Sequence, residues 1–239
     1  MPRLRKPEAA LARLVFFKQV VETSEKDTGG KGPYVSAATV ERTKQFIPGL
    51  ESGLGNISQF TSLTQKEIRE KNQAMTVLKV YIRDFWEVLK RRVYREQLPL
   101  DLFALFQLPK SGKVPALSSN RECLEMAELI IKGEAVALES GYAPMTNPDV
   151  SQLSEKLDIA RKELKDVSEA DLQLDKVQES VSGLMPEAKK LVDRIIAELE
   201  FNLYEKEDAG KRRIMRNYGV QYEVTKNEVQ EEDIETSAN

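Results

Sequence analysis

The residue types that most often carry out acid–base chemistry near neutral pH are nearly absent from this chain. It contains no histidine and one cysteine among its 239 residues. Histidine is the usual general base, proton shuttle and metal ligand at physiological pH. A serine or threonine nucleophile would lack a histidine base, and no motif points to a lysine in its place. The composition therefore predicts a protein that is not an enzyme and has no catalytic residue.

A glycine-rich segment at residues 29–32 has the composition of a phosphate-binding loop but lacks its spacing. That motif requires a glycine five residues before its second glycine, and Ser or Thr after its lysine. Glu25 and Gly32 stand at those two positions, and a helix rather than a strand is expected before the segment. We interpret the segment as a linker and expect no bound cofactor.

Metal binding has equally little support in the sequence. A di-iron centre in a helical bundle uses Glu-x-x-His pairs, which a chain without histidine cannot form. Glu122, Glu125 and Glu128 are close along one expected helix, and oxygen ligands suit Mg²⁺ or Ca²⁺. A solvated acidic face explains these three glutamates better, and Cys123, among apolar neighbours, is expected to be a small core residue. No metal site is expected.

Two clusters of basic residues suggest an alternative function in nucleic-acid binding, because basic side chains near a tyrosine track a phosphate backbone. Both clusters lie near the expected C-terminal ends of helices, where positive charge also offsets the helix dipole. The chain is acidic overall, with a net charge of −3, so we consider nucleic acid an unlikely partner. The residues concerned are Lys90, Arg91, Arg92, Arg95, Lys211, Arg212 and Arg213.

Apolar residues recur at helical spacing along most of the chain, which predicts helices packed on helices. The first helix is expected at residues 7–26, followed by the linker. A short helix is expected at residues 36–47 because Pro48-Gly49 should end it. A long helix should then begin near Thr64 and Glu67, which form a capping-box pattern, and run to about residue 97.

Apolar residues crowd into residues 100–108, within the tip expected at residues 99–115 between this long helix and the next. Ser119 and Glu122 form a second capping box, so residues 62–140 are expected to form a helical hairpin with an apolar tip. The tip either plugs the end of the bundle or is exposed to a partner or to a membrane surface or pore. Its candidate contact residues are Leu102, Phe103 and Phe106.

The longest apolar stripe lies in the C-terminal part, between residues 147 and 218, where its three–four spacing is typical of coiled-coil packing. Asn147-Pro148 should begin this region. Gly183 and Pro186 interrupt the stripe, so either two helices or one kinked rod is expected. Leu164, Leu174 and Leu191 on the stripe are candidates for contact with protein partners.

These patterns predict an all-α fold, an elongated up-and-down bundle with long coiled-coil-like helices and a disordered acidic C-terminal tail. The expected parts are residues 1–35 (first helix and linker), 36–222 (main bundle) and 223–239 (tail). Residues 220–224 alternate briefly and are weak evidence for an edge strand. No apolar run reaches the roughly 20 residues needed to cross a bilayer.

The charge distribution and the apolar stripes together indicate the function. Residues 1–110 carry 19 basic and 12 acidic residues, and residues 111–239 carry 17 and 27. The two halves of the chain therefore carry opposite net charges and attract each other, either within one chain or between copies. We therefore expect a cytoplasmic structural, scaffold or assembly protein that binds protein partners, including a second copy of itself, with no small-molecule substrate and no membrane partner.

Overall fold

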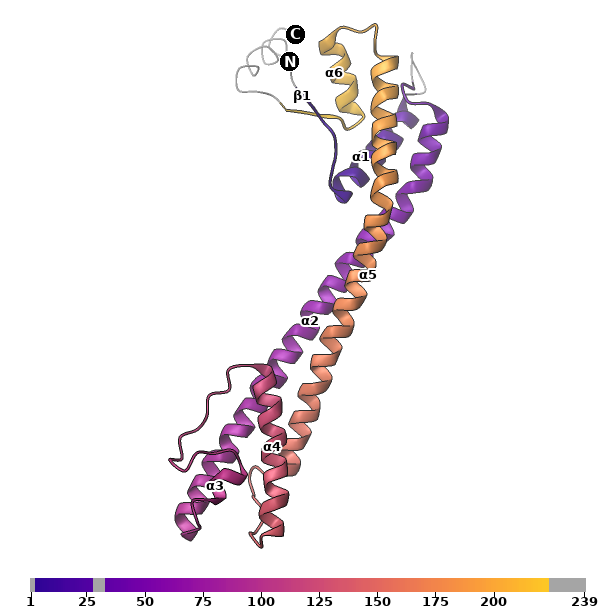
Figure 1. Cartoon of the computed structure of the whole chain (residues 1–239). Coiled ribbons are helices and arrows are strands. Elements are labelled where there is room, and N and C mark those ends of the chain that lie inside the picture. Colours follow the sequence, from indigo (N-terminus) through magenta and orange to yellow (C-terminus); the bar gives the residue numbers. More distant parts are fainter. Residues whose placement is uncertain (1–2, 28–32, 224–239) are drawn as a thin grey trace. The chain divides into compact units, whose positions relative to one another are not determined.

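The structure is a computed structural model and describes residues 3–27 and 33–223. The fold is all-α, and the only strands among the described residues form one short two-stranded ribbon (Figure 1). In chain order the elements are β1 (Arg3–Arg5), α1 (Ala10–Lys26), α2 (Ala37–Glu96), α3 (Leu102–Leu105), α4 (Asn120–Glu139), α5 (Val150–Asn202), α6 (Asp208–Asn217) and β2 (Gln221–Glu223).

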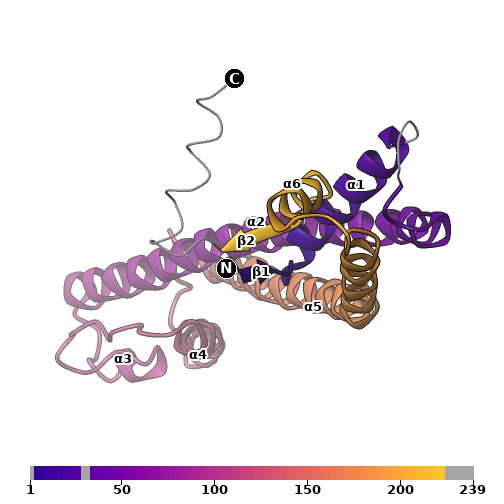
Figure 2. The same ribbon diagram turned by 90° about the horizontal axis from the view of Figure 1, so that it is seen from above.

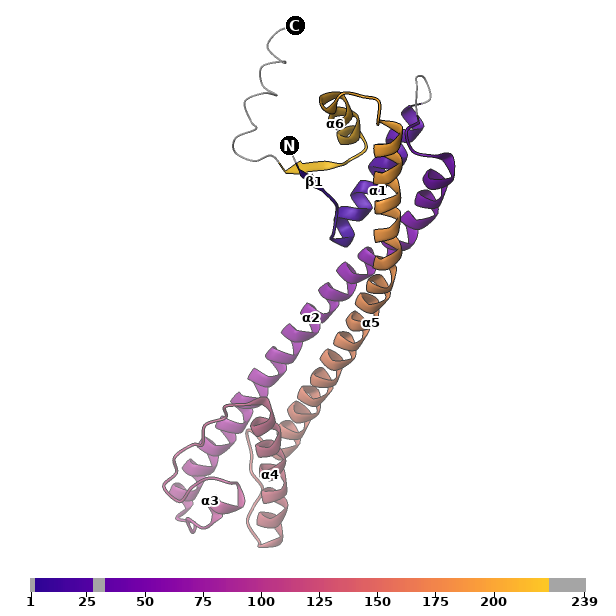
Figure 3. The same cartoon turned by 45° about the horizontal axis from the view of Figure 1, so that its top comes forward.

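The chain divides into two compact units, and the two long helices contribute to both. Unit 1 comprises Met1–Gln59 and Asp175–Asn239, and unit 2 comprises Phe60–Leu174. Within each unit, α2 and α5 run side by side in opposite directions (Figures 1 and 3). In the described parts of both units, no helix is both long enough and apolar enough to cross a membrane.

Helix α2 continues through Pro48, so the expected end of a short helix at residue 47 is wrong. Proline in a helix interior removes one hydrogen bond and costs about 3 kcal/mol. The residues that follow bury apolar surface: Leu50 is fully buried, and Leu54 and Ile57 pack against the core of unit 1. Burial of each such side chain contributes about 1.5–3 kcal/mol, which outweighs the lost hydrogen bond.

The capping box expected at Thr64 and Glu67 is also wrong, because both residues lie in the interior of α2. Thr64 is buried, and its hydroxyl has no hydrogen-bond partner. The second capping box is confirmed at the start of α4, where Ser119 accepts a hydrogen bond from the Glu122 backbone N–H. The Glu122 carboxylate accepts one from the Ser119 N–H in return.

Helix α5 runs without a break through Gly183 and Pro186, so the expected alternative of two helices divided at these residues is wrong. It begins slightly later than Asn147-Pro148 suggested, after Asp149. The Asp149 carboxylate accepts hydrogen bonds from the Gln152 N–H (2.8 Å) and the Ser151 hydroxyl (2.6 Å). These hydrogen bonds, first that from Ser151, lower the pKa of Asp149. Pro186 is accommodated inside the helix.

The core of unit 1 is formed mainly by α1 and by residues 181–199 of α5. Phe17 and Val20 of α1 and Ile195 and Leu199 of α5 are fully buried there. Arg13 interrupts the apolar face of α1, yet it is buried as well. Its guanidinium donates hydrogen bonds to the carbonyl oxygens of Pro7 and Met185, so its polar atoms are satisfied.

The two-stranded ribbon pairs β1 with β2. Strand β2 lies within residues 220–224, where the sequence indicated an edge strand. β1 and β2 are antiparallel, with Arg3 opposite Glu223 and Leu4 opposite Tyr222 (Figure 2). Just before β2, the Tyr218 hydroxyl donates a hydrogen bond to Asp27. Burial, followed by this hydrogen bond, raises the pKa of Tyr218 to about 12. The expected linker at residues 29–32 and the tail beyond residue 223 lie outside the described residues.

The core of unit 2 is formed by α3, α4, residues 75–93 of α2 and residues 153–160 of α5. Trp86 lies at its centre, fully buried, and its indole N–H donates a hydrogen bond to the Phe106 carbonyl (2.9 Å). Helix α3 lies against α4 (Figure 2). The apolar segment between α2 and α4 therefore folds back into the core of unit 2.

Candidate helix-contact groove

A groove runs between α2 and α5 in unit 2, with a volume of about 290 Å³. Both of its walls are long helices that also contribute to the core of the unit. Its residues are spaced so that they face outward on one flank of each helix. They are Glu70, Gln73, Ala74 and Val77 of α2, and Lys156, Ile159 and Glu163 of α5. This groove is called the α2–α5 groove below.

The centre of the α2–α5 groove is apolar. Ala74 is partly buried against the core of unit 2, and Val77 is half-buried. Ile159 on the opposite wall is 41% exposed. An isoleucine held in this way leaves apolar surface in water that another protein surface would cover.

These three apolar residues were not predicted from the sequence, because each stands one position before a residue of the apolar stripe of its helix. Ala74 precedes Met75, and Ile159 precedes Ala160. Consecutive helical residues are about 100° apart, so the stripe residue is buried while its neighbour lies at the edge of the apolar face. A search for residues that broaden a stripe would have found them.

Charged residues form the rim of the α2–α5 groove. The Lys156 ammonium donates a hydrogen bond to Glu155 at 2.9 Å and lies 5.7 Å from the centre of the Tyr81 ring. The hydrogen bond to Glu155 is the main cause of its raised pKa. Glu70 and Glu163 place carboxylates on both walls. The groove thus offers an apolar centre with charges of both signs around it.

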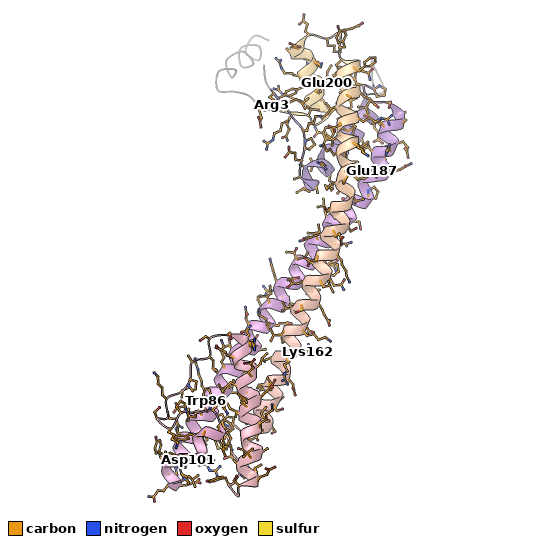
Figure 4. The ribbon with its side chains drawn as sticks, in the orientation of Figure 1. Arg3, Trp86, Asp101, Lys162, Glu187 and Glu200 are labelled. Atoms are coloured by element: carbon orange, nitrogen blue, oxygen red, sulfur yellow. The ribbon has the colours of Figure 1, made fainter. Side chains whose placement is uncertain are left out.

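Three carboxylates beside the groove approach one another closely enough to share a cation. Oxygen atoms of Glu67, Glu163 and Asp166 lie within 4.8 Å of one another. Two lysines already pair with them: Lys66 lies 3.3 Å from Glu67, and Lys162 lies 2.7 Å from Asp166 and 3.4 Å from Glu163. Figure 4 shows Lys162 on α5. These ammonium groups balance most of the negative charge, so we assign no metal to the cluster.

The acidic residues that the sequence grouped on α4 have separate partners. Glu122 caps its own helix, Glu125 pairs with Arg121 at 2.6 Å, and Glu128 pairs with Arg161 of α5. Cys123 between them is fully buried, and burial is the main reason that the pKa of its thiol is raised. A buried thiol with a raised pKa is a poor nucleophile.

The three residues predicted at the apolar tip are core residues of unit 2. Leu102 is 3% exposed, Phe103 is fully buried and Phe106 is 1% exposed. The ring of Phe106 lies 5.3 Å from that of Phe85, between ring centres. Of the expected alternatives, the structure has the one in which the tip plugs the bundle, so these side chains offer no surface to a membrane or a partner.

The stripe residues of α5 lie in different surroundings. Leu164 is half-buried at the end of the core of unit 2, and Leu174 is half-buried beyond that core. Leu191 is buried in the core of unit 1. Leu172, beside the stripe, is 52% exposed. In unit 2 the cover provided by α4 therefore ends near Leu164, and only α2 accompanies α5 further along.

The basic residues of the first cluster are partly used inside unit 2. Arg92 donates hydrogen bonds to the carbonyl oxygens of residues 143 and 144, and Lys90 pairs with Glu87 at 3.1 Å. Arg91 and Arg95 remain exposed. These pairings reduce the positive charge available to a phosphate backbone.

The second basic cluster lies on α6 in unit 1. Lys211 and Arg212 are half-buried, and Arg213 is exposed. Arg216 on the same helix lies 5.8 Å from the centre of the Tyr222 ring. Arg216, which lies on α6 outside the cluster, therefore contributes to the packing of α6 against the ribbon.

Comparison of the chain with models of protein families, with curated proteins and with solved structures finds no match.

Proposed function

We propose that the protein is a non-enzymatic structural, scaffold or assembly protein that acts through helix-mediated contacts, including contacts with a second copy of itself. The observation that carries this proposal is the α2–α5 groove, in which Ile159 is 41% exposed beside Val77 and Ala74. Full burial of a side chain of this size contributes about 1.5–3 kcal/mol, so covering the 41% of Ile159 that is exposed contributes about 1 kcal/mol. A partner helix that inserts apolar side chains between α2 and α5 would gain this energy.

The charges around the groove support a second copy as partner. Glutamates and a lysine line the groove together, so an identical surface meets both signs of charge and can pair with itself about a two-fold axis. The proposal includes a cytoplasmic location, supported by a single cysteine that is buried and has no thiol partner within the chain.

The proposal is tested by replacing Ile159 and measuring the mass in solution. In size-exclusion chromatography with light scattering, we expect the wild-type chain to be larger than a monomer. The Ile159→Lys variant should shift toward the monomer, because a charge would then face the apolar centre of the partner. Circular dichroism checks that the variant remains helical.

A matched control is available on another helix of unit 2. Val136 of α4 is 45% exposed, close to the value for Ile159, but it does not line the groove. Val136→Lys should leave the mass unchanged. A wild-type chain that is monomeric at all concentrations, or an equal effect of both substitutions, would contradict the proposal.

A further inference from the structure

A second and larger groove lies within unit 1, between β1 and the beginning of α1. Its volume is about 1150 Å³, and the turn at Gly219 and β2 close its other side. All the residues that line it belong to unit 1, so it is separate from the α2–α5 groove. It is called the β1–α1 groove below.

The apolar wall of the β1–α1 groove is a pair of α1 residues one turn apart. Leu11 is 62% exposed and Val15 is 56% exposed, and Ala12 and Phe16 lie beside them. Leu11 and Val15 are the most exposed of the large apolar side chains that line the groove. They favour a ligand that brings apolar side chains of its own.

The opposite wall of the β1–α1 groove carries three basic residues, which outnumber the two acidic residues of the lining, Glu8 and Glu223. Arg3, Arg5 and Lys6 follow one another along β1 and the residue after it, and all three line the groove. Arg5 lies 3.9 Å from Glu223 and its side chain is 67% exposed, and Lys6 pairs with Asp193 while its side chain is 51% exposed. Their positive charge therefore still faces the solvent (Figure 4 shows Arg3). An acidic segment with apolar residues would match both walls.

The chain itself supplies such a segment. Glu223, the last residue of β2, lines the groove, and residues 224–239 follow it directly. This segment contains five acidic residues and one lysine, together with Val224, Val229 and Ile234. We propose that the β1–α1 groove binds residues 224–239 of the same chain, with the acidic side chains near β1 and the aliphatic ones near Leu11 and Val15.

The tether makes this binding favourable even when each contact is weak. Sixteen residues span up to about 50 Å when extended, so the segment is long enough to reverse after β2 and enter the groove. A short flexible tether gives an effective concentration on the order of 1 mM. If the intrinsic dissociation constant were also on the order of 1 mM, the segment would occupy the groove in half of the molecules. Because the attraction is between exposed charges, salt should weaken it.

Paramagnetic relaxation enhancement in the full chain tests the proposal. A nitroxide label on Ser237→Cys reports the position of the segment, since Cys123 is fully buried and shielded from the reagent. We expect selective loss of the amide signals of Leu11, Ala12 and Val15. Raising the salt from about 0.05 M to about 0.5 M should restore them, because the Debye length falls several-fold.

The matched variant neutralises the segment without touching any described residue. In the chain with Glu231→Gln, Glu232→Gln, Asp233→Asn and Glu235→Gln, the same label should leave the signals of Leu11 and Val15 intact. Replacing Lys110 and Lys113 of unit 2 by glutamate is the control and should leave the signal loss unchanged. Unchanged signals in the wild-type chain, or signal loss confined to unit 2, would overturn the proposal.

Mixing distinguishes the same chain from a second copy. When labelled chain without ¹⁵N is mixed with unlabelled ¹⁵N chain, the signals of Leu11 and Val15 should remain. Their loss in the mixture would show that the segment binds another copy and would overturn binding within one chain. This outcome is distinct from the test of the α2–α5 groove, because neither experiment uses residues of the other groove.

Discussion

The backbone carbonyl of Leu105 lies directly against Gly133, so that α3 meets α4 at the one position of α4 without a side chain. A Cβ atom on residue 133 would overlap the Leu105 carbonyl oxygen and would lie 2.8 Å from its carbonyl carbon. The Phe106 ring would be 3.3 Å from the same atom. Glycine at this position therefore allows the buried segment of α3 to pack into the core of unit 2.

The first prediction is that Gly133→Ala destabilises unit 2 although alanine favours helices. Overpacking against a backbone carbonyl should cost about 2 kcal/mol, more than the gain in helix propensity of about 1 kcal/mol. Urea unfolding monitored by the fluorescence of Trp86, the single tryptophan, measures the loss in unit 2. Gly183→Ala is the control. A Cβ atom added at residue 183 would have no other atom within 4 Å. We therefore expect Gly183→Ala to stabilise α5 by about 0.5–1 kcal/mol, measured by circular dichroism during unfolding.

The second prediction concerns the buried carboxylate of Glu134, which is 5% exposed. It accepts a hydrogen bond of 2.6 Å from the backbone N–H of Met145 and so fixes the segment that leads into α5. Glu134→Ala leaves that N–H without its partner and should lower the free energy of unfolding by about 1–3 kcal/mol. Glu134→Gln keeps an acceptor and should cost less.

Unfolding of unit 2 in urea, again followed through Trp86, measures both changes. The exposed Glu139 on the same helix is the comparison, and Glu139→Ala should change the free energy of unfolding by less than about 0.5 kcal/mol. Equal losses for Glu134→Ala and Glu139→Ala would show that the contact with Met145 contributes nothing.

The third prediction is a pH dependence that originates at Glu198 in unit 1. Burial would raise the pKa of this carboxyl, but hydrogen bonds from Thr39, Ser36 and Arg194 outweigh it and lower the pKa below 4.5. A lowered pKa in the folded state stabilises the fold above the unfolded value of 4.5. This contribution is lost as the pH falls below that value toward the folded pKa.

Thermal unfolding between about pH 6 and pH 3 measures this effect. Glu198→Gln should be less stable than the wild type at the upper end, and the difference should shrink as the pH falls. Glu205 is an exposed residue beyond the end of α5, and Glu205→Gln is the control. Its stability should differ from that of the wild type by the same amount at every pH. A constant difference between Glu198→Gln and the wild type would mean that the charge of Glu198 does not stabilise unit 1.

The fold class follows from sequence because apolar periodicity reports directly on helices, whereas helix ends depend on what each residue packs against. Ser119 and Thr64 show the contrast, since each is followed three residues later by glutamate. Ser119 caps α4, but Thr64 is buried inside α2. The helix end predicted at Pro48 was wrong for the same reason. The energetic cost of a proline inside a helix is known from the sequence, but the burial of the apolar residues that follow it is visible only in the tertiary structure.

The candidate site was harder to predict than the helices. The sequence indicated Phe103 and Phe106 as contact residues, yet their size and apolar character are equally suited to a core, and both are buried. Ile159 was overlooked because exposure at the edge of a stripe depends on where a third helix ends. The position of Ile159 beside the stripe can be read from the sequence, but its exposure is visible only in the tertiary structure.

The division of the chain between the two units sets an order of folding during synthesis. Unit 2 is one uninterrupted stretch, whereas unit 1 needs both Met1–Gln59 and Asp175–Asn239. Domains tend to fold as soon as they have left the ribosome. The core of unit 2 around Trp86 can therefore form before the residues that pack against Phe17 and Val20 in unit 1 have been synthesised. Those residues include Ile195 and Leu199. Until Ile195 and Leu199 have been synthesised, the apolar face of α1 lacks the side chains that cover it in unit 1.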